Sequence, residues 1–332
     1  MPWDPLAEYL GGLVGCTSTP EADAEFDAFV KSQGHSPDGG VICEQYGLAG
    51  SGVGKLTPLW VYMERIAPGC FPGSAQVTGD CVAKAMTLAA TCTQLCEIAA
   101  AKPDEVTGHV EELPEQPDEG RQDRVNASEV TWWYRGYSGS GWQCQIAAQV
   151  ICEKSGLWPR KNYDQFGFDL TKYNRNGANS LYGARTPPDE VTREGQKHLM
   201  RTATRCTSYE QIRDLLANGC GIGTCGGEGW SSRRQEHGYA PRQGGWAHAL
   251  CYVGADERPE VIKEFGEPLI CISNSWGKWN SGPRRVLGTD LDIPEGCWWA
   301  KWSDCKNRTA IAFSGFNGWA AKKLPNWTEG IF

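Results

Sequence analysis

The stretch from Val82 to Ala101 constrains the fold more than any other part of the sequence, because it contains neither glycine nor proline. It reads VAKAMTLAATCTQLCEIAAA and is rich in Ala, Leu and Met, which favour helix. Its few polar residues predict a long helix that is largely buried. Gly79 and Asp80 stand directly before it and are expected to supply a turn and an N-cap.

Shorter segments around this helix indicate the fold class. Further helices are expected over residues 21–31, 144–154 and 208–218, and an exposed, acidic, proline-rich loop over 103–124. Beyond these, short strands alternate with glycine turns: AHALCYVGAD (247–256), PLICISNSWG (268–277) and GCWWAKWS (296–303). Helices that come first and strands that follow predict an α+β fold, in which a helical part packs against a sheet.

Composition narrows the function classes. A net charge of -8 argues against broad nucleic-acid binding, which needs basic patches. No run of about 18 apolar residues is present, so we expect no membrane contact through a spanning helix. The N-terminus MPWDPLAEYLGGLVG lacks the features of a signal peptide, so a cytoplasmic location is expected. In that compartment most of the fifteen cysteines should be reduced thiols.

Two binding motifs are considered and rejected. The segment GLAGSGVGKLT resembles a phosphate-binding loop, but Ala49 replaces its first glycine and Leu56 stands where Ser or Thr must reach the metal. No paired C-x₂-C spacing supports a zinc site, and Cys92, Cys96, Cys220 and Cys225 are interpreted as core thiols. Neither a cofactor nor a metal is expected.

Three residues far apart in the chain carry the candidate chemistry. Cys81 is expected at the start of the long helix, where unpaired amides and the helix dipole lower the pKa of a thiol. His248 lies near the start of one predicted strand, and Asn274 at the end of another. Each alone is more simply a structural residue; their order along the chain favours a catalytic set.

The sequence segments around these residues resemble those of the papain family of cysteine proteases. QVTGDCVAKA resembles the segment that opens the family's catalytic helix, WAHALCYVG resembles its histidine strand, and ISNSWGKWNSG resembles its Asn-Ser-Trp-Gly segment. The resemblance covers roughly residues 70–315. It implies a papain-like fold, in which the nucleophile helix of a helical subdomain packs against a twisted antiparallel sheet subdomain.

The resemblance also implies roles. Cys81 would attack a carbonyl carbon to form an acyl-enzyme, and His248 would hold an ion pair with it and protonate the leaving amine. Asn274 would orient the imidazole beneath Trp276. The side chain of Gln76, with the Cys81 amide, would form the oxyanion hole.

Substrate contacts are expected from Gly141, Trp142 and Trp276. Here Gly139-Ser140-Gly141-Trp142 replaces the family's cysteine-bearing double-glycine strand. Gln76 lies one residue closer to Cys81 than is usual in the family, and Asp80 replaces a small neutral residue. A carboxylate that faced the sulfur would raise the pKa of the thiol, whereas one that capped the helix would not.

These patterns predict residues 1–69 as an N-terminal extension without the family's propeptide motifs, residues 70–320 as the catalytic domain and 321–332 as a tail. The first functional hypothesis is a peptidase acting on a peptide or protein substrate. The second is a papain-fold component of a larger particle such as a phage virion, with other subunits as partners, because Q-x-x-G-D-C sequences resemble ones from tailed bacteriophages. Trp298, Trp299 and Trp302 suit a half-buried strand or, alternatively, an interface.

Overall fold

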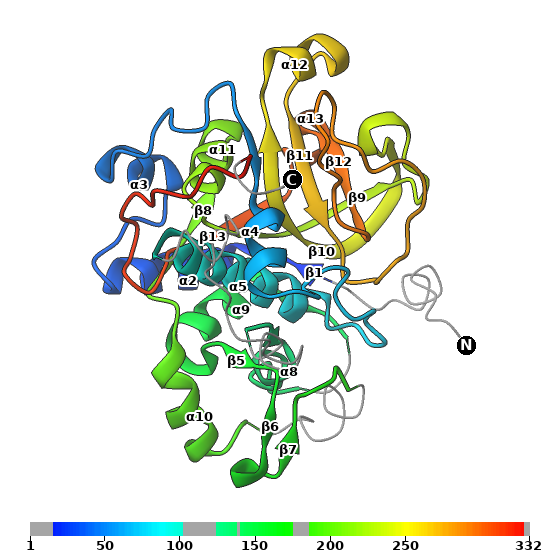
Figure 1. Ribbon diagram of the computed structural model, residues 1–332. Coiled ribbons are helices and arrows are strands. Elements are labelled where there is room, and N and C mark those ends of the chain that lie inside the picture. Colours follow the sequence, from blue (N-terminus) through cyan, green and yellow to red (C-terminus); the bar gives the residue numbers. More distant parts are fainter. Residues whose placement is uncertain (1–15, 102–123, 138–139, 175–185, 329–332) are drawn as a thin grey trace, which may run out of the picture.

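An antiparallel sheet and one long helix dominate the computed structural model, which describes residues 16–101, 124–137, 140–174 and 186–328. Strands β9 to β12 fill the upper part of the molecule in Figure 1, and α8, α9 and α10 lie in the lower part, with α5 between them. The predicted α+β class is confirmed.

The helices of the described ranges are α2 (Pro20–Ser32), α3 (Gly39–Gln45), α4 (Leu59–Ile66), α5 (Cys81–Ala101), α8 (Glu129–Trp133), α9 (Cys144–Val150), α10 (Asp189–Gly195), α11 (Tyr209–Ala217), α12 (Pro259–Phe265) and α13 (Trp302–Cys305). A π-helical turn, Ile151–Ser155, continues α9. The helices predicted over 21–31, 82–101, 144–154 and 208–218 are therefore present, the third ending in the π-helical turn. The loop predicted over 103–124 lies outside the described residues except for its last position.

The strands are β1 (Cys16–Thr17), β2 (Leu56–Pro58), β3 (Asn126–Ala127), β4 (Trp142–Gln143), β5 (Trp158–Pro159), β6 (Asn162–Tyr163), β7 (Phe168–Asp169), β8 (Ala203–Cys206), β9 (Ile222–Trp230), β10 (Arg242–Asp256), β11 (Leu269–Ser273), β12 (Cys297–Lys301) and β13 (Thr309–Phe313). The main sheet has the order β12-β11-β10-β9-β13-β8, and β2 also pairs with β10. All of its pairings are antiparallel.

Helix α5 lies directly on strands β9 and β10. Two glycines make this close approach possible: Gly221, directly before β9, and Gly223, within it. A Cβ added at Gly221 would lie 2.1 Å from the Ala89 carbonyl oxygen, and one at Gly223 would lie 2.3 Å from Met86 Cε. Because the helix cannot move away without losing this packing, its first residue, Cys81, is held at a fixed place beside the sheet. This is the packing of nucleophile helix on antiparallel sheet that was predicted.

Residues on both sides of the predicted boundary at residue 69 pack into one core. Strand β2 pairs with β10, and Phe26, Ile42 and Met63 are buried in the same core as α5 and the sheet. The segment assigned to a tail is also attached, since Tyr62 donates a 2.8 Å hydrogen bond to the carbonyl of Pro325. The boundaries at residues 69 and 320 stay predictions, although residues on both sides of each boundary are in contact.

Two tryptophans of β12 are more deeply buried than predicted. Trp298 and Trp299 on β12 are fully buried rather than half-buried, so they belong to the core and not to an interface. None of the helices described is both long and apolar enough to cross a membrane.

Candidate active site

Asn274, the residue after β11, holds the His248 ring of β10. His248 Nε2 lies 2.7 Å from Asn274 Oδ1. The same oxygen accepts a 2.7 Å hydrogen bond from the Ser275 amide, a group that can only donate. The acceptor end of the Asn274 amide therefore faces the ring, and Nε2 of the neutral imidazole carries the proton. Nδ1 is then the ring nitrogen left to accept a proton.

Aromatic rings enclose this hydrogen bond. Trp276 stacks on His248 with ring centroids 4.5 Å apart and planes inclined by 27°. Trp246, which the sequence reading did not single out, packs on Trp276 at 4.9 Å, and Trp279 lies edge-on to Trp276 at 5.4 Å. Trp276 thus covers the ring as the resemblance implied, and the imidazole is removed from water.

The environment of His248 favours the neutral ring. Burial lowers the pKa of His248 to about 3, against the raising effect of the bond to Asn274 and with a further lowering by the positive charge of Arg308. The resemblance implied a resting ion pair with the thiol. That ion pair stays a prediction, and the dry aromatic enclosure opposes it, because burial disfavours an imidazolium.

Cys81 is the first residue of α5, as predicted, and is 1% exposed. Its side chain lies where the helix presents unpaired amides and the positive end of its dipole. Helix α5 packs against β10, so the elements that carry Cys81 and His248 are in contact. The direct pairing of the sulfur with Nδ1 stays a prediction.

Gln76 is connected to the segment that follows Asn274. The backbone amide of Gln76 donates a 2.7 Å hydrogen bond to the Ser275 carbonyl. The side-chain oxygen Oε1 of Gln76 accepts a hydrogen bond from the Ser275 hydroxyl. Its Nε2 donates to the Thr78 carbonyl at 3.0 Å. One Nε2 hydrogen is therefore engaged, and the second is the one that could reach an oxyanion.

Asp80 occupies the predicted N-cap position, since its carbonyl accepts a 3.1 Å hydrogen bond from the Lys84 amide, but its side chain bonds to Tyr173 instead of capping the helix. Its Oδ2 accepts a 2.9 Å hydrogen bond from the Tyr173 hydroxyl, and its Oδ1 has no partner within the described ranges. Lys84 Nζ lies 3.5 Å from the centre of the Tyr173 ring. Burial raises the pKa of Asp80 to about 6, with Lys84 and Tyr173 opposing this shift. The sequence reading missed Tyr173, which lies 93 positions from Asp80 and has no motif around it.

Gly141 and Trp142 differ in what they offer a substrate. The Gly141 amide donates a 3.1 Å hydrogen bond to the Gly79 carbonyl, which places it beside the turn that leads into Cys81. Trp142 is buried, its ring packs edge-on against Trp132, and β4 is paired in parallel with β1. A substrate contact through the Trp142 indole is therefore not supported, while contacts by Gly141 and Trp276 stay predictions.

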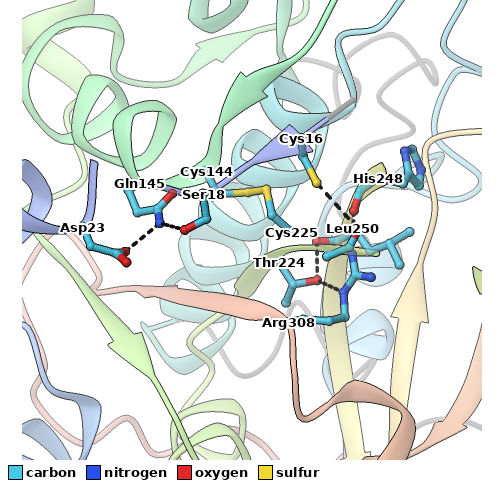
Figure 2. The surroundings of a disulfide bond; sticks show 11 residues. Cys16, Ser18, Asp23, Cys144, Gln145, Thr224, Cys225, His248, Leu250 and Arg308 are labelled. Atoms are coloured by element: carbon cyan, nitrogen blue, oxygen red, sulfur yellow. Dashed lines mark hydrogen bonds between the residues drawn. A yellow bond between two sulfur atoms is a disulfide. The ribbon is translucent and has the colours of Figure 1, made fainter. Parts of the chain in front are cut away.

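A disulfide crosses from the helical half to the sheet. It joins Cys144, the first residue of α9, to Cys225 of β9, with the Cα atoms 6.2 Å apart. Figure 2 shows this bond with Cys16 of β1 and Arg308 around it. Cys225 pairs with Ala249, the residue after His248. The interpretation of Cys225 as a core thiol is thus wrong: no short spacing marked the bond, because its partners are 81 positions apart.

A cavity of about 410 Å³ lies beside α5. It is lined by Lys84, Leu88 and Tyr173 and reaches Asn274 and Ser275, but neither Cys81 nor His248 lines it. It is therefore not the groove in which a substrate would meet the thiol. Within the described residues, no group of three or more His, Cys, Asp and Glu side chains could hold a metal ion.

Comparison with known proteins gives similarity in structure only. No family model and no curated protein matches the chain. Among solved structures, xylellain, a cysteine protease from Xylella fastidiosa, is 17% identical with a TM-score of 0.43, and the match covers 73% of this chain and 81% of xylellain.

Two proforms are similar at a comparable level. The ragweed pollen allergen Amb a 11, a cysteine protease, is 11% identical with a TM-score of 0.42, over 75% of this chain and 62% of the allergen. Procathepsin L2 from the larval midgut of Tenebrio molitor is 12% identical with a TM-score of 0.40, over 76% and 66% of the two chains. This chain therefore spans less than two thirds of either proform. These identities and TM-scores are too low to assign a function, so the function is inferred from the side chains of the site and not from the similarity.

Proposed function

We propose that this chain is a papain-like cysteine peptidase that hydrolyses amide bonds of a peptide or protein substrate. One observation carries the proposal: His248 is bonded to Asn274 through Nε2 beneath Trp276, on a strand against which the helix beginning at Cys81 packs. A histidine with one nitrogen held and the other available is suited to take a proton from a thiol.

In the proposed reaction the imidazole of His248 accepts a proton and then donates it, once in each half of the reaction. The Cys81 thiol gives its proton to Nδ1 of His248 as the sulfur bonds to the carbonyl carbon. The second Nε2 hydrogen of Gln76 and the Cys81 amide stabilise the oxyanion. The C–N bond then breaks, and the imidazolium gives its proton to the leaving amine. Water, deprotonated by the same ring, hydrolyses the thioester and restores the thiol.

A thiol-directed epoxide tests this proposal without knowledge of the substrate. We expect it to label Cys81 in the native protein far faster than in the denatured protein, as read by peptide mass spectrometry. Cys81→Ala should lose the label, whereas Cys92→Ala, which removes a buried thiol of the same helix, should retain it. Equal, slow labelling of native and denatured protein would show that the thiol is not activated.

The second hypothesis, a component of a larger particle such as a phage virion, stays a prediction. No feature of the described residues identifies a partner subunit. Native mass spectrometry of the isolated chain distinguishes the two: a stable monomer labelled at Cys81 supports the peptidase, and an obligate assembly without labelling supports the structural protein.

A further inference from the structure

Strand β10 is irregular just before His248. Its register with β9 shifts between Arg242 and Gly245 and again between Gly245 and His248. Such bulges change the direction in which the following side chains point. His248 pairs with Gly226 and is the first residue of the regular run that continues to Tyr252, so the regular ladder supports its backbone from one side only. A contact from outside the ladder would hold the backbone at this position more firmly.

Arg308 supplies a contact of this kind. It lies between α13 and β13, and its side chain is 0% exposed. Its Nη2 donates a 2.6 Å hydrogen bond to the backbone carbonyl of His248. Its Nε donates to Thr224 Oγ1 at 3.1 Å, and its Nη1 lies 3.2 Å from Glu228 Oε2. One rigid guanidinium thus ties the bulged strand to two positions of β9.

A glycine of β9 leaves room for the ion pair between Arg308 and Glu228. Gly226 is the residue of β9 opposite His248. A Cβ added there would lie 2.6 Å from Glu228 Oε2 and 2.7 Å from Arg308 Cγ. A glycine opposite the imidazole therefore leaves the space that the pair occupies. Glu228 balances a charge that would otherwise be buried alone, which is strongly unfavourable.

We propose that Arg308, held by Glu228, is a positioning residue for His248: it fixes the backbone of the bulged strand so that the ring meets Asn274 on one side and the Cys81 thiol on the other. The statement that the ring meets the Cys81 thiol rests on the proposed function. The statement that Arg308 positions the ring does not, because it follows from the contacts of His248 alone. Arg308 also adds to the lowering of the pKa of His248 that burial causes.

Arg308→Lys is the main variant, because it keeps the charge, but its donors all lie on one nitrogen and cannot reach the three acceptors that the planar guanidinium serves from separate nitrogens. Arg234→Lys is its matched control. Arg234 is also buried, and it donates to the carbonyls of Cys297 and Gly282 at 2.9 and 3.1 Å. None of its described contacts is with Cys81, His248 or Asn274, so it reports the general effect of losing a buried arginine.

Two measurements test the proposal. The first is ¹⁵N NMR of the imidazoles, with His248 assigned through His248→Gln. The wild type should show protonated Nε2 and bare Nδ1, and Arg308→Lys should move both shifts toward a mixture of tautomers. The second is the rate of Cys81 labelling by the epoxide, which should fall about ten- to a hundredfold in Arg308→Lys, since small misplacements of a reacting group cost rates of this order. Arg234→Lys should change neither.

Glu228→Gln keeps the test decisive if Arg308→Lys does not fold. It leaves all donors of Arg308 in place and removes the balancing charge, so a smaller change in the same direction is expected. Unchanged ¹⁵N shifts in a folded Arg308 or Glu228 variant, or equal changes in Arg234→Lys, would overturn the proposal. If the wild-type thiol proves unreactive, the proposed function fails, while the ¹⁵N shifts still decide whether Arg308 positions the ring.

Discussion

The two sides of the candidate site are built differently. On the sheet side, His248 is held by an amide oxygen, covered by Trp276 and supported from behind by Arg308. On the helix side, the residue before Cys81 is a buried carboxylate, with Tyr173 and Lys84 around it. On the first side, hydrogen bonds and rings surround a histidine that burial keeps neutral, and on the second, burial raises the pKa of a carboxylate.

This difference makes the two sides respond to pH in opposite directions. The folded-state pKa of His248 is lowered from 6.5 to about 3, so its contribution to stability is present above pH 6.5 and lost as the pH falls toward 3. The folded-state pKa of Asp80 is raised from 3.8 to about 6, so its contribution is fully present below pH 3.8 and lost as the pH rises through 6. Between pH 3.8 and pH 6 the two slopes oppose each other, so the combined contribution changes little there, and it is greatest above pH 6.5, where the contribution of His248 is complete.

The largest expected effect comes from removing the ring of the sheet side. His248→Ala should slow epoxide labelling of Cys81 about 10²–10⁴-fold, because general base catalysis contributes factors of this size. His198→Ala, a histidine of the helical half, is the control. Labelling of His248→Ala at the wild-type rate would mean that the helix alone activates the thiol.

Separating the two sides is the next test. The double variant Cys144→Ala, Cys225→Ala removes the covalent bond between α9 and β9 and should lower the free energy of unfolding by about 2–5 kcal/mol. Urea denaturation with and without a reducing agent measures this. Reductant should destabilise the wild type and leave the variant unchanged. If reductant has no effect on the wild type, the bond does not form in solution.

Asp80→Asn isolates the helix side. The variant cannot ionise, so its stability relative to the wild type should rise between pH 4 and pH 8, by up to about 3 kcal/mol for a shift of about two pKa units. Urea denaturation across this range gives the value. Tyr173→Phe is the complementary variant: it removes the hydrogen bond that lowers the pKa of Asp80, so the variant's loss of stability should extend to a higher pH than that of the wild type. Parallel curves for Asp80→Asn and the wild type would contradict a perturbed Asp80.

The sequence predicted those features of each side that depend on neighbouring residues, and missed those that depend on contacts between distant positions of the chain. The long helix and its start at Cys81 depend on neighbouring residues, and so does the strand bearing His248. Asn274 was found because Ser, Trp and Gly follow it directly. The contacts made by Tyr173, Arg308 and Cys144 join positions between 60 and 93 apart in the chain, so no local pattern marks them. The pairing of β2 with β10 also joins positions far apart in the chain, and only the fold shows it.

The smallest expected effect tests whether the rings of the sheet side act beyond general packing. Trp246 contacts Trp276 and lies edge-on to Trp279 at 5.4 Å and to His248 at 6.4 Å. Trp246→Leu should destabilise the protein by about 0.5–1.5 kcal/mol per ring pair lost and slow Cys81 labelling about threefold to tenfold. The rate falls because a less enclosed Trp276 admits water to the bond between His248 and Asn274, which loosens the ring.

Trp158→Leu is the control for that substitution. Trp158 packs against Tyr163 and Phe168 in a separate cluster of the helical half. It should cost similar stability and leave the labelling rate unchanged. Equal slowing in both variants would mean that the rate follows overall stability, in which case the aromatic enclosure does not distinguish the sheet side from the rest of the core. Slowing confined to Trp246→Leu would show that the enclosure of His248 is itself part of the site, because only that substitution changes the rings around the imidazole.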